Sequence, residues 1–571
     1  MEISHFAKLT EREQSELLSL MPKNGLAERI TISLCPKCAE EKRWIEMKIP
    51  ALVFEEKGKM WIIKKCKKHG EVRDLYWGDA QSYKKIKKYH DPGISIENPF
   101  IKIDKINCPL NCGLCKEHKS HTCLGNIAIT NRCDLSCWYC FYYAKENDPI
   151  YEPTLEEIKL MARNMANEKP VGTNAIQITG GEPTLRDDLI EIIGAVKREG
   201  IEHIQLNTNG ITISKNPQLL KNICKAGSHV MYLSFDGISP ETNPKNFWEV
   251  PDVIKNCRQT EMGIVLVPTV IGGINDHELG DIVRFAFGHI DVVRGVNFQP
   301  VSLVGRMPDK LRKQQRITIP GAIKRIEEQT DGQIGKEDFY TIPCTKAVTD
   351  FIEVMKNSRK YRMSTHFACG MATYVFKDGK KLVPITRFFN VDDFFSDLET
   401  MTENIKNARS RKIEKTIAVS RLLLSINKYV DESKKPKDLK FGKLLLSAFT
   451  SGNYKGLAPL HHKSLFIGLM HFQDPYNWDI DRTHKCVIHY GSPDGRIIPF
   501  CTFNVIPELY RDTLQRKHSM AMKEWEKKTG KKMSETQHQR NLTEKQKKEI
   551  IKYYAPYKLS KKRIMEPDWE K

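Results

Sequence analysis

The positions of the sixteen cysteines constrain this chain more than any other feature of its 571 residues. Fourteen of them fall into groups, and only Cys224 and Cys257 stand alone, in apolar patterns typical of buried thiols. Because residues 1–20 are charged throughout, no apolar signal sequence is expected, and we place the chain in a reducing cytoplasm. Grouped cysteines bind metals there more often than they form disulfides. The sequence therefore predicts several metal centres.

The composition is that of a folded globular protein. Hydrophobic residues make up 40% of the chain and charged residues 28%, and no apolar run approaches the roughly 20 residues of a membrane span. The formal net charge of +20 suggests an anionic partner. Residues 511–571 hold 18 Lys and Arg against 9 Asp and Glu. This tail is either a solvated helical face or, through its interleaved aromatic residues, an attachment to an anionic surface.

The strongest single motif is the cysteine triplet in the segment NRCDLSCWYCFYY, formed by Cys133, Cys137 and Cys140. Three thiolates at this spacing can bind three corners of a 4Fe-4S cluster and leave the fourth iron open to another ligand. The triplet follows an apolar segment, residues 126–130, so we expect it on the loop after a first strand. Tyr139 offers an aromatic face beside the cluster.

Beyond the triplet, short apolar strands alternate with helical segments, which predicts βα units and a parallel sheet. Ligands bind at the carboxyl ends of such strands. Polar or glycine-rich turns end successive predicted strands, in the segments AIQITGGEPTL, IQLNTNG, MYLSFDG and VNFQPVS. One such turn would be ordinary, but together with the triplet they indicate one shared site.

The ordered triplet and turns resemble those of the radical S-adenosylmethionine (radical SAM) enzymes, over residues 126–302. The resemblance implies a partial (βα)6 TIM-type barrel, a 4Fe-4S cluster on the triplet and S-adenosylmethionine bound to its open iron. It also implies that a 5'-deoxyadenosyl radical abstracts hydrogen from an unactivated C–H bond. The cofactor-binding residues that it implies are Tyr139, Gly180, Gly181, Glu182, Pro183, Thr208, Asn209, Ser234, Asp236 and Gln299.

A separate metal site is predicted near the N-terminus. Cys35 and Cys38 form one knuckle, and Cys66 with His69 forms a second, separated by segments that indicate a β-ribbon. Two knuckles joined in this way can enclose one tetrahedral ion. The spacing leaves open whether that mononuclear ion is iron or zinc.

Two further quartets complete the prediction. Cys108, Cys112, Cys115 and Cys123 lie within sixteen residues and suit an auxiliary 4Fe-4S cluster, with a closed zinc site as the alternative. The other four, dispersed along the C-terminal half, predict a second auxiliary cluster, with inert buried cysteines as the alternative: Cys344, Cys369, Cys486 and Cys501. The expected cofactors are thus S-adenosylmethionine, three 4Fe-4S clusters and one mononuclear iron or zinc.

The expected fold class is α/β, a partial barrel flanked by an N-terminal metal-binding ribbon and a C-terminal α+β domain for an auxiliary cluster. The expected organisation has five parts. They are the ribbon domain at 1–100, the first auxiliary cluster at 101–125, the radical SAM barrel at 126–305, the C-terminal cluster domain at 306–510 and the basic helical tail at 511–571.

The whole cysteine layout resembles the archaeal tetraether lipid synthases. That resemblance implies radical coupling of the phytanyl chain ends of an archaeal diether phospholipid, with two molecules of S-adenosylmethionine per C–C bond. Related proteins methylate a pterin precursor, so a radical methyltransferase acting on 7,8-dihydro-6-hydroxymethylpterin is the alternative. An iron-sulfur or zinc protein that binds nucleic acid is a third hypothesis, which the ordered barrel motifs oppose.

The partners expected under the lipid reading are the phospholipid substrate and a reduced ferredoxin-type electron donor, with peripheral contact at the membrane surface as a further option. No nucleic acid is expected. The spacing of residues alone does not choose between lipid and pterin, and it defines neither a substrate channel nor the oligomeric state.

Overall fold

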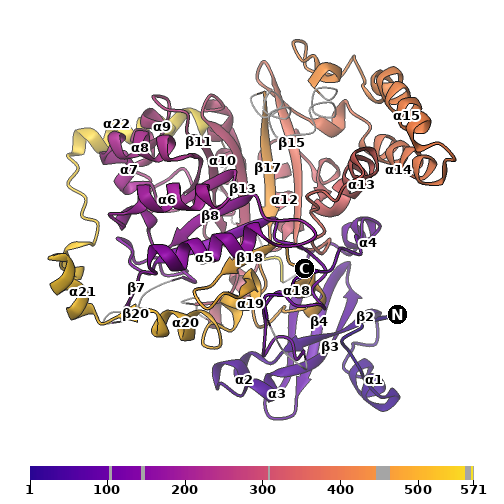
Figure 1. The fold of residues 1–571 in the computed structure, drawn as a ribbon, viewed down its shortest axis with the longest axis horizontal. Helices are drawn as coiled ribbons and strands as arrows, with labels where there is room; N and C mark the ends of the chain where they lie inside the picture. Colours follow the sequence, from indigo (N-terminus) through magenta and orange to yellow (C-terminus); the bar gives the residue numbers. More distant parts are fainter. Residues whose placement is uncertain (102–105, 143–147, 306–308, 445–462, 560–566, 570–571) are drawn as a thin grey trace.

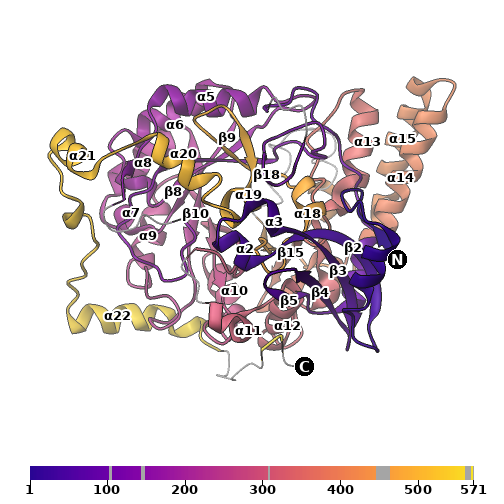
Figure 2. The same cartoon turned by 90° about the horizontal axis from the view of Figure 1, so that it is seen from below.

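The computed structural model describes residues 1–101, 106–142, 148–305, 309–444, 463–559 and 567–569. Figure 1 shows the N-terminal sheet below a larger α/β body, with a group of helices at the upper right. The C-terminal tail runs around the outside of the body (Figures 1 and 2).

The N-terminal part is a five-stranded sheet in the order β1-β2-β3-β4-β5, with antiparallel pairing from β2 to β5. Consecutive residues of β2 and β3 are buried, so both faces of the sheet are covered: Ala51 and Val53 pack into one apolar cluster, and Leu52 and Phe54 pack into another. The ribbon expected from the sequence is thus present. Its elements are β1 (Glu2–Ile3), α1 (Glu11–Leu18), β2 (Leu26–Leu34), α2 (Pro36–Glu40), α3 (Trp44–Met47), β3 (Lys48–Glu56), β4 (Lys59–Cys66), β5 (Gly70–Trp77) and α4 (Ala80–Lys87).

Six neighbouring parallel strands form the partial barrel, in the order β6-β8-β9-β10-β11-β13. Helices link them on the outer face, as the alternating pattern predicts. This confirms the expected (βα)6 arrangement. The strands are β6 (Leu124–Thr130), β8 (Ala175–Gly180), β9 (His203–Thr208), β10 (Ser228–Ser234), β11 (Gly263–Val267) and β13 (Val293–Pro300), with the short β7 (Ile150–Tyr151) and β12 (Thr269–Val270). The helices are α5 (Leu155–Ala166), α6 (Leu189–Arg198), α7 (Ile211–Lys215), α8 (Pro217–Ala226), α9 (Val250–Cys257) and α10 (Leu279–Gly288).

The C-terminal half adds strands to both edges of the barrel sheet. β17 (Ser464–Met470) pairs in parallel with β13, and β18 (Ile488–Gly491) pairs in parallel with β6. Regions expected as separate domains therefore share one sheet. The other strands of this half are β14 (Tyr340–Thr341), β15 (Gly370–Asp378), β16 (Lys381–Pro384) and β19 (Ile497–Pro499). Its helices are α11 (Arg312–Gln315), α12 (Ile319–Gln329), α13 (Lys346–Lys356), α14 (Val391–Asn407), α15 (Arg411–Ser425), α18 (Ile480–His484) and α19 (Phe500–Val505).

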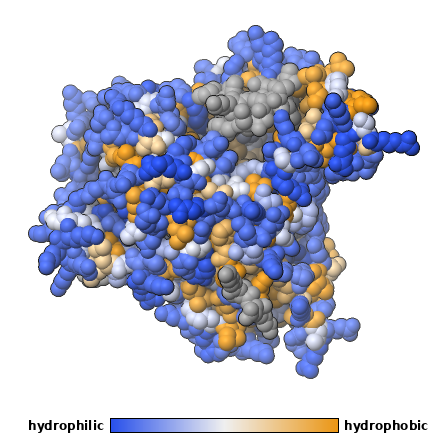
Figure 3. Space-filling model, viewed as in Figure 1, coloured by the Kyte–Doolittle hydropathy of each residue, from blue (hydrophilic) through white to orange (hydrophobic). Residues whose placement is uncertain are grey.

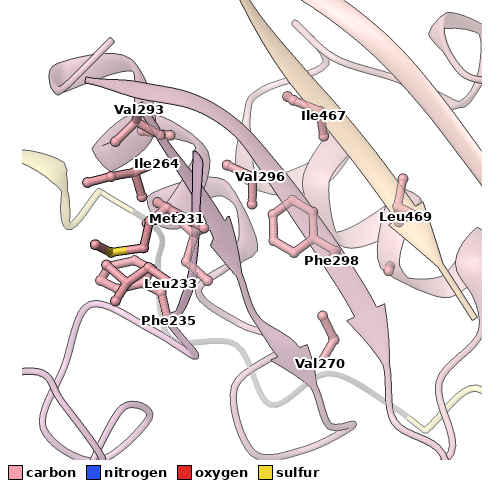
Figure 4. Close-up of a cluster of buried hydrophobic side chains, with 14 of the residues drawn as sticks. Met231, Leu233, Phe235, Ile264, Val270, Val293, Val296, Phe298, Ile467 and Leu469 are labelled. Atoms are coloured by element: carbon pink, nitrogen blue, oxygen red, sulfur yellow. The ribbon is translucent and has the colours of Figure 1, made fainter. Parts of the chain in front are cut away.

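The main core lies between the barrel sheet and its helices. Figure 4 shows apolar side chains of β10, β11 and β13 beside those of β17, which include Ile467 and Leu469. All of these side chains are buried in one cluster. The added strand therefore stabilises the barrel directly, because burial of each large apolar side chain contributes roughly 1.5–3 kcal/mol.

The basic tail forms α20 (Arg511–Lys517), β20 (Ser519–Met520), α21 (Met522–Thr529) and α22 (Glu544–Tyr554). Its aromatic residues pack against the protein. Trp525 and Tyr554 are buried, and the Trp569 ring meets that of Trp61 at 5.2 Å between centroids. These contacts account for the interleaved aromatics without an anionic surface.

The surface drawn in Figure 3 is mostly hydrophilic, with apolar residues gathered at the upper right, where Figure 1 places α14 and α15. Ile413 and Leu424 of α15 are exposed there. Within the described ranges, the helices all lack the combination of length and apolarity that crossing a bilayer requires.

Candidate functional site

The triplet Cys133, Cys137 and Cys140 lies on the loop after β6, as expected. The loop turns back on itself through a hydrogen bond of 3.2 Å from the Cys140 amide to the Cys137 carbonyl. Burial raises the pKa of the Cys133 thiol, and the nearby Asp134 and Glu182 raise it further. Thiolates at this position therefore need a cation, and a partly accessible iron-sulfur cluster fits that need.

The glycines of the GGEP turn let its backbone approach the loop after β6 that carries the cysteine triplet, called the cluster loop below. A Cβ atom on Gly180 would lie 2.1 Å from the Thr130 carbonyl oxygen, and one on Gly181 would lie 2.1 Å from that of Arg132. Gly180 also has a φ of +141°, which L side chains rarely adopt. The two glycines therefore allow the backbones of the two loops to touch. Pro183 begins a short helical turn beyond them.

Glu182 joins the ends of β8 and β9. Its carboxylate accepts hydrogen bonds from the Thr208 hydroxyl at 2.7 Å and the Asn209 amide at 2.8 Å. Asn209 in turn donates from Nδ2 to Asp134 at 2.6 Å. Burial, followed by the charge of Asp134, raises the pKa of Glu182 to about 7. The expected cofactor residues Glu182, Thr208 and Asn209 thus form one network that supports the cluster loop.

A buried ion pair lies beside the cysteines. Lys245 Nζ is 2.7 Å from Asp236 Oδ2, the Tyr139 hydroxyl donates to the same oxygen, and the lysine lies over the Tyr139 ring at 5.5 Å. The charges of Cys137 and Cys140 act on both Lys245 and Tyr139. Sequence reasoning missed Lys245, although it stands only nine residues after Asp236 in the turn that follows β10.

The remaining expected cofactor residues lie at nearby strand ends. The Ser234 carbonyl, at the end of β10, accepts a hydrogen bond of 2.7 Å from Asn246 Nδ2. The Gln299 amide, near the end of β13, donates to the Pro268 carbonyl at 2.8 Å. The carboxyl ends of the parallel strands therefore meet around the triplet, where ligands bind in such folds.

The ribbon brings its four predicted ligands together. The donor atoms of Cys35, Cys38, Cys66 and His69 all lie within 4.8 Å of one another. His69 Nδ1 is 3.4–3.7 Å from the three sulfur atoms. Such spacings match the edges of a tetrahedron around one ion with bonds of about 2.0–2.3 Å. His69 Nε2 lies 3.0 Å from Glu41 Oε1, the arrangement that orients a metal-binding imidazole.

The first auxiliary quartet is only partly assembled. The thiols of Cys108 and Cys112 are hydrogen-bond partners, and the charge of Cys112 acts on Cys115. Cys123 lies elsewhere, because its backbone leads directly into β6 and its thiol donates to the Arg362 carbonyl at 3.1 Å. The local spacing of cysteines did not reveal this separation.

The dispersed quartet is also divided. Cys369, Cys486 and Cys501 act on one another electrostatically, and burial raises the pKa of Cys501 to about 11. Cys369 accepts a hydrogen bond of 3.4 Å from Arg482 Nε, as a cluster thiolate can. The charged neighbour of Cys344 is instead Asp392.

The tail covers part of the cluster loop. The His538 amide donates to the Asp134 carbonyl at 2.9 Å, and Gln537 Nε2 donates to that of Cys133 at 3.4 Å. Arg132 lies over the Trp525 ring at 4.5 Å. These contacts span about 400 residues of sequence, so local patterns gave no sign of them.

Comparisons with known proteins give matches to both the barrel and the ribbon. A family model described as the Radical SAM superfamily matches residues 127–286, and one described as the HMPTM N-terminal zinc ribbon domain matches residues 28–78. The chain is 44% identical over 510 residues to the 7,8-dihydro-6-hydroxymethylpterin dimethyltransferase of Methanocaldococcus jannaschii. That alignment covers 88% of this chain and 97% of that protein.

Other known proteins match shorter parts of the chain. The GTP 3',8-cyclase of Limosilactobacillus fermentum is 34% identical over 31% of this chain and 54% of its own length. Among solved structures, Streptococcus suis SuiB bound to S-adenosylmethionine aligns with 36% of this chain and 46% of its own, at 18% identity and a TM-score of 0.28.

Proposed function

The chain belongs to the radical SAM superfamily, in the family of the 7,8-dihydro-6-hydroxymethylpterin dimethyltransferase of M. jannaschii, and from this premise we propose that it methylates a reduced pterin of that kind. The observation that carries the proposal is the alignment over 88% of this chain and 97% of that protein. This relationship also corrects the lipid-coupling interpretation of the cysteine layout, because the full-length relative is a pterin methyltransferase.

The triplet and the strand ends would hold the cofactors. Cys133, Cys137 and Cys140 would bind a 4Fe-4S cluster, with S-adenosylmethionine at its open iron. When bound, this pair supplies hydrogen-atom abstraction from an unactivated C–H bond. Lys245 and Asp236 would hold Tyr139 beside the cluster, and a reduced ferredoxin-type protein would supply the electron.

An aromatic pocket beside the triplet is the candidate place for a flat heteroaromatic substrate. It is lined by Phe141, Phe472 and Phe500 together with Gln473, Asn504 and Cys501. The rings of Phe472 and Phe500 stack at 4.1 Å between centroids, so a pterin would have to displace one of them to stack there. Phe141 directly follows the last cysteine of the triplet. Asn504 Oδ1 is buried and finds no hydrogen-bond partner within the described ranges, so it could accept from a pterin N–H group.

The test is an anaerobic assay of the full chain. The protein is reconstituted with iron and sulfide and given a reductant, S-adenosylmethionine and 7,8-dihydro-6-hydroxymethylpterin, and the products are analysed by mass. We expect the pterin to gain the mass of one or two CH2 units, because each methyl group replaces a hydrogen.

The matched controls are two cysteine variants. Cys137→Ala should lose both cleavage of S-adenosylmethionine and methylation, whereas Cys224→Ala, outside every group, should keep both. Cleavage of S-adenosylmethionine without any gain of pterin mass would show that the substrate is wrong.

A further inference from the structure

One cavity lies between the loop of the first auxiliary group and α18. Its lining includes Cys108, Cys112, Cys115, His118 and His484. Three thiols and two imidazoles from segments more than 360 residues apart thus converge on one space. Such a set of soft and borderline ligands is characteristic of iron-sulfur and zinc sites.

His484 has the geometry of a metal ligand. The residue is 4% exposed, and Nδ1 lies 3.1 Å from the Glu117 carbonyl oxygen, so Nδ1 carries the proton and donates. The ring stacks on Phe6 at 3.8 Å between centroids, which fixes its plane. Nε2 therefore presents a lone pair, and in the described part of the chain it has no hydrogen-bond partner. A backbone carbonyl on one nitrogen and a free lone pair on the other is the usual arrangement of a metal-binding histidine.

His118 is already engaged. Its Nε2 lies 2.8 Å from the Cys486 carbonyl oxygen and 3.1 Å from His489 Nε2. Cys123 is engaged as well, through its hydrogen bond to the Arg362 carbonyl. Among the described residues that line this cavity, His484 therefore offers a buried nitrogen, Nε2, whose lone pair is available to a metal.

We propose that this cavity binds an auxiliary 4Fe-4S cluster through the thiolates of Cys108, Cys112 and Cys115 and through Nε2 of His484, with Cys123 outside the ligand set. Three thiolates and one imidazole supply the four ligands that the four irons of such a cluster need.

The ligand set has an electrostatic consequence. A neutral imidazole in place of a thiolate makes the cluster less negative, and histidine ligation raises the reduction potential of iron-sulfur centres. This inference goes beyond the proposed function, because it does not depend on which substrate the radical attacks.

The test uses pulsed electron paramagnetic resonance on the full-length protein. The background carries Cys133→Ala, Cys137→Ala and Cys140→Ala, so that the radical cluster contributes no signal. The protein is labelled with 15N-histidine, loaded with zinc in the ribbon, reconstituted with iron and sulfide, and reduced. We expect a 15N coupling to a reduced cluster that disappears in His484→Ala and persists in Cys123→Ser and His118→Ala.

His484→Cys keeps the proposal testable where the alanine variant is unstable. It should retain the iron content of the background, lose the 15N coupling and lower the reduction potential. The assignment is overturned if the background shows no 15N coupling, if the coupling survives in His484→Ala or His484→Cys, or if Cys123→Ser or His118→Ala removes it. Unchanged iron content after Cys112→Ala combined with His484→Ala would overturn the cluster itself.

Discussion

Lys245 shows how single buried charges organise the site. It is 9% exposed, yet it is a cation, because Asp236 lies 2.7 Å away and Cys137 and Cys140 lie nearby. Removing one partner of a buried pair leaves the other charge uncompensated, which is more costly than loss of an exposed pair. The pair therefore ties the end of β10 to the cluster loop.

Lys245→Met should lower the free energy of unfolding by about 3–5 kcal/mol, because it leaves Asp236 buried without its cation. Urea unfolding monitored by circular dichroism measures this loss. Lys255→Met, at an exposed position of α9, is the matched control and should change stability by no more than about 0.5 kcal/mol. Equal effects of the two substitutions would contradict the role of the pair.

Glu168 is a buried carboxyl, remote from the triplet in sequence. Burial raises its pKa from 4.5 to about 8. Because the folded state holds this proton more tightly than the unfolded state, the stabilisation is complete below pH 4.5 and is lost as the pH rises through 8. Stability should fall with a slope approaching 1.4 kcal/mol per pH unit in that window.

Glu168→Gln should remove this component of the pH dependence, because glutamine does not titrate. Comparing the two proteins by denaturant unfolding between pH 5 and pH 9 isolates the contribution of this one carboxyl. Parallel stability curves for wild type and variant across that range would show that Glu168 does not contribute to the pH dependence of stability.

At the scale of elements, the ribbon shows how a local pattern becomes a site. Its two knuckles flank the paired strands β3 and β4, and the pairing brings Cys66 and His69 to Cys35 and Cys38. Each knuckle is a short motif, so its spacing was readable from sequence. The auxiliary groups differ, because their members belong to different elements: Cys123 leads into β6.

Cys38→Ser should remove the bound ion from the ribbon and lower its unfolding temperature, because binding free energy at a structural metal site contributes to folding. Metal analysis and differential scanning calorimetry measure the two effects. Cys224→Ser leaves the four donors intact and should preserve both metal content and unfolding temperature. A metal content that Cys38→Ser does not change would exclude Cys38 as a ligand.

At the scale of the whole molecule, the C-terminal half completes the barrel. β17 and β18 extend the sheet at both edges, and the tail reaches the cluster loop through Gln537 and His538. Tyr554 of α22 stacks on Phe247 at 4.3 Å between ring centroids and donates to its carbonyl. The basic tail is therefore held by the barrel despite its surplus of charge.

Tyr554→Ala should destabilise the protein by about 3–5 kcal/mol, because it empties an aromatic position that is 2% exposed. Ile551→Ala in the same helix is the control, since Ile551 is 49% exposed, and it should have an effect of about 0.5 kcal/mol or less. Thermal unfolding of both variants makes the comparison. A tail that is only a solvated face would give two equally small effects.

The sequence by itself determined the parallel βα sheet and the ribbon, because hydrophobic periodicity and short cysteine spacings act within one or two elements, and the resemblance of its ordered motifs indicated the radical SAM family. It did not determine the substrate: the cysteine layout indicated lipid coupling, whereas the full-length relative is a pterin methyltransferase. Only the tertiary structure separated Cys123 and Cys344 from their groups and brought His484 to the cavity lined by Cys108, Cys112 and Cys115. The physical reason is that such contacts depend on how distant elements pack, which no local spacing encodes.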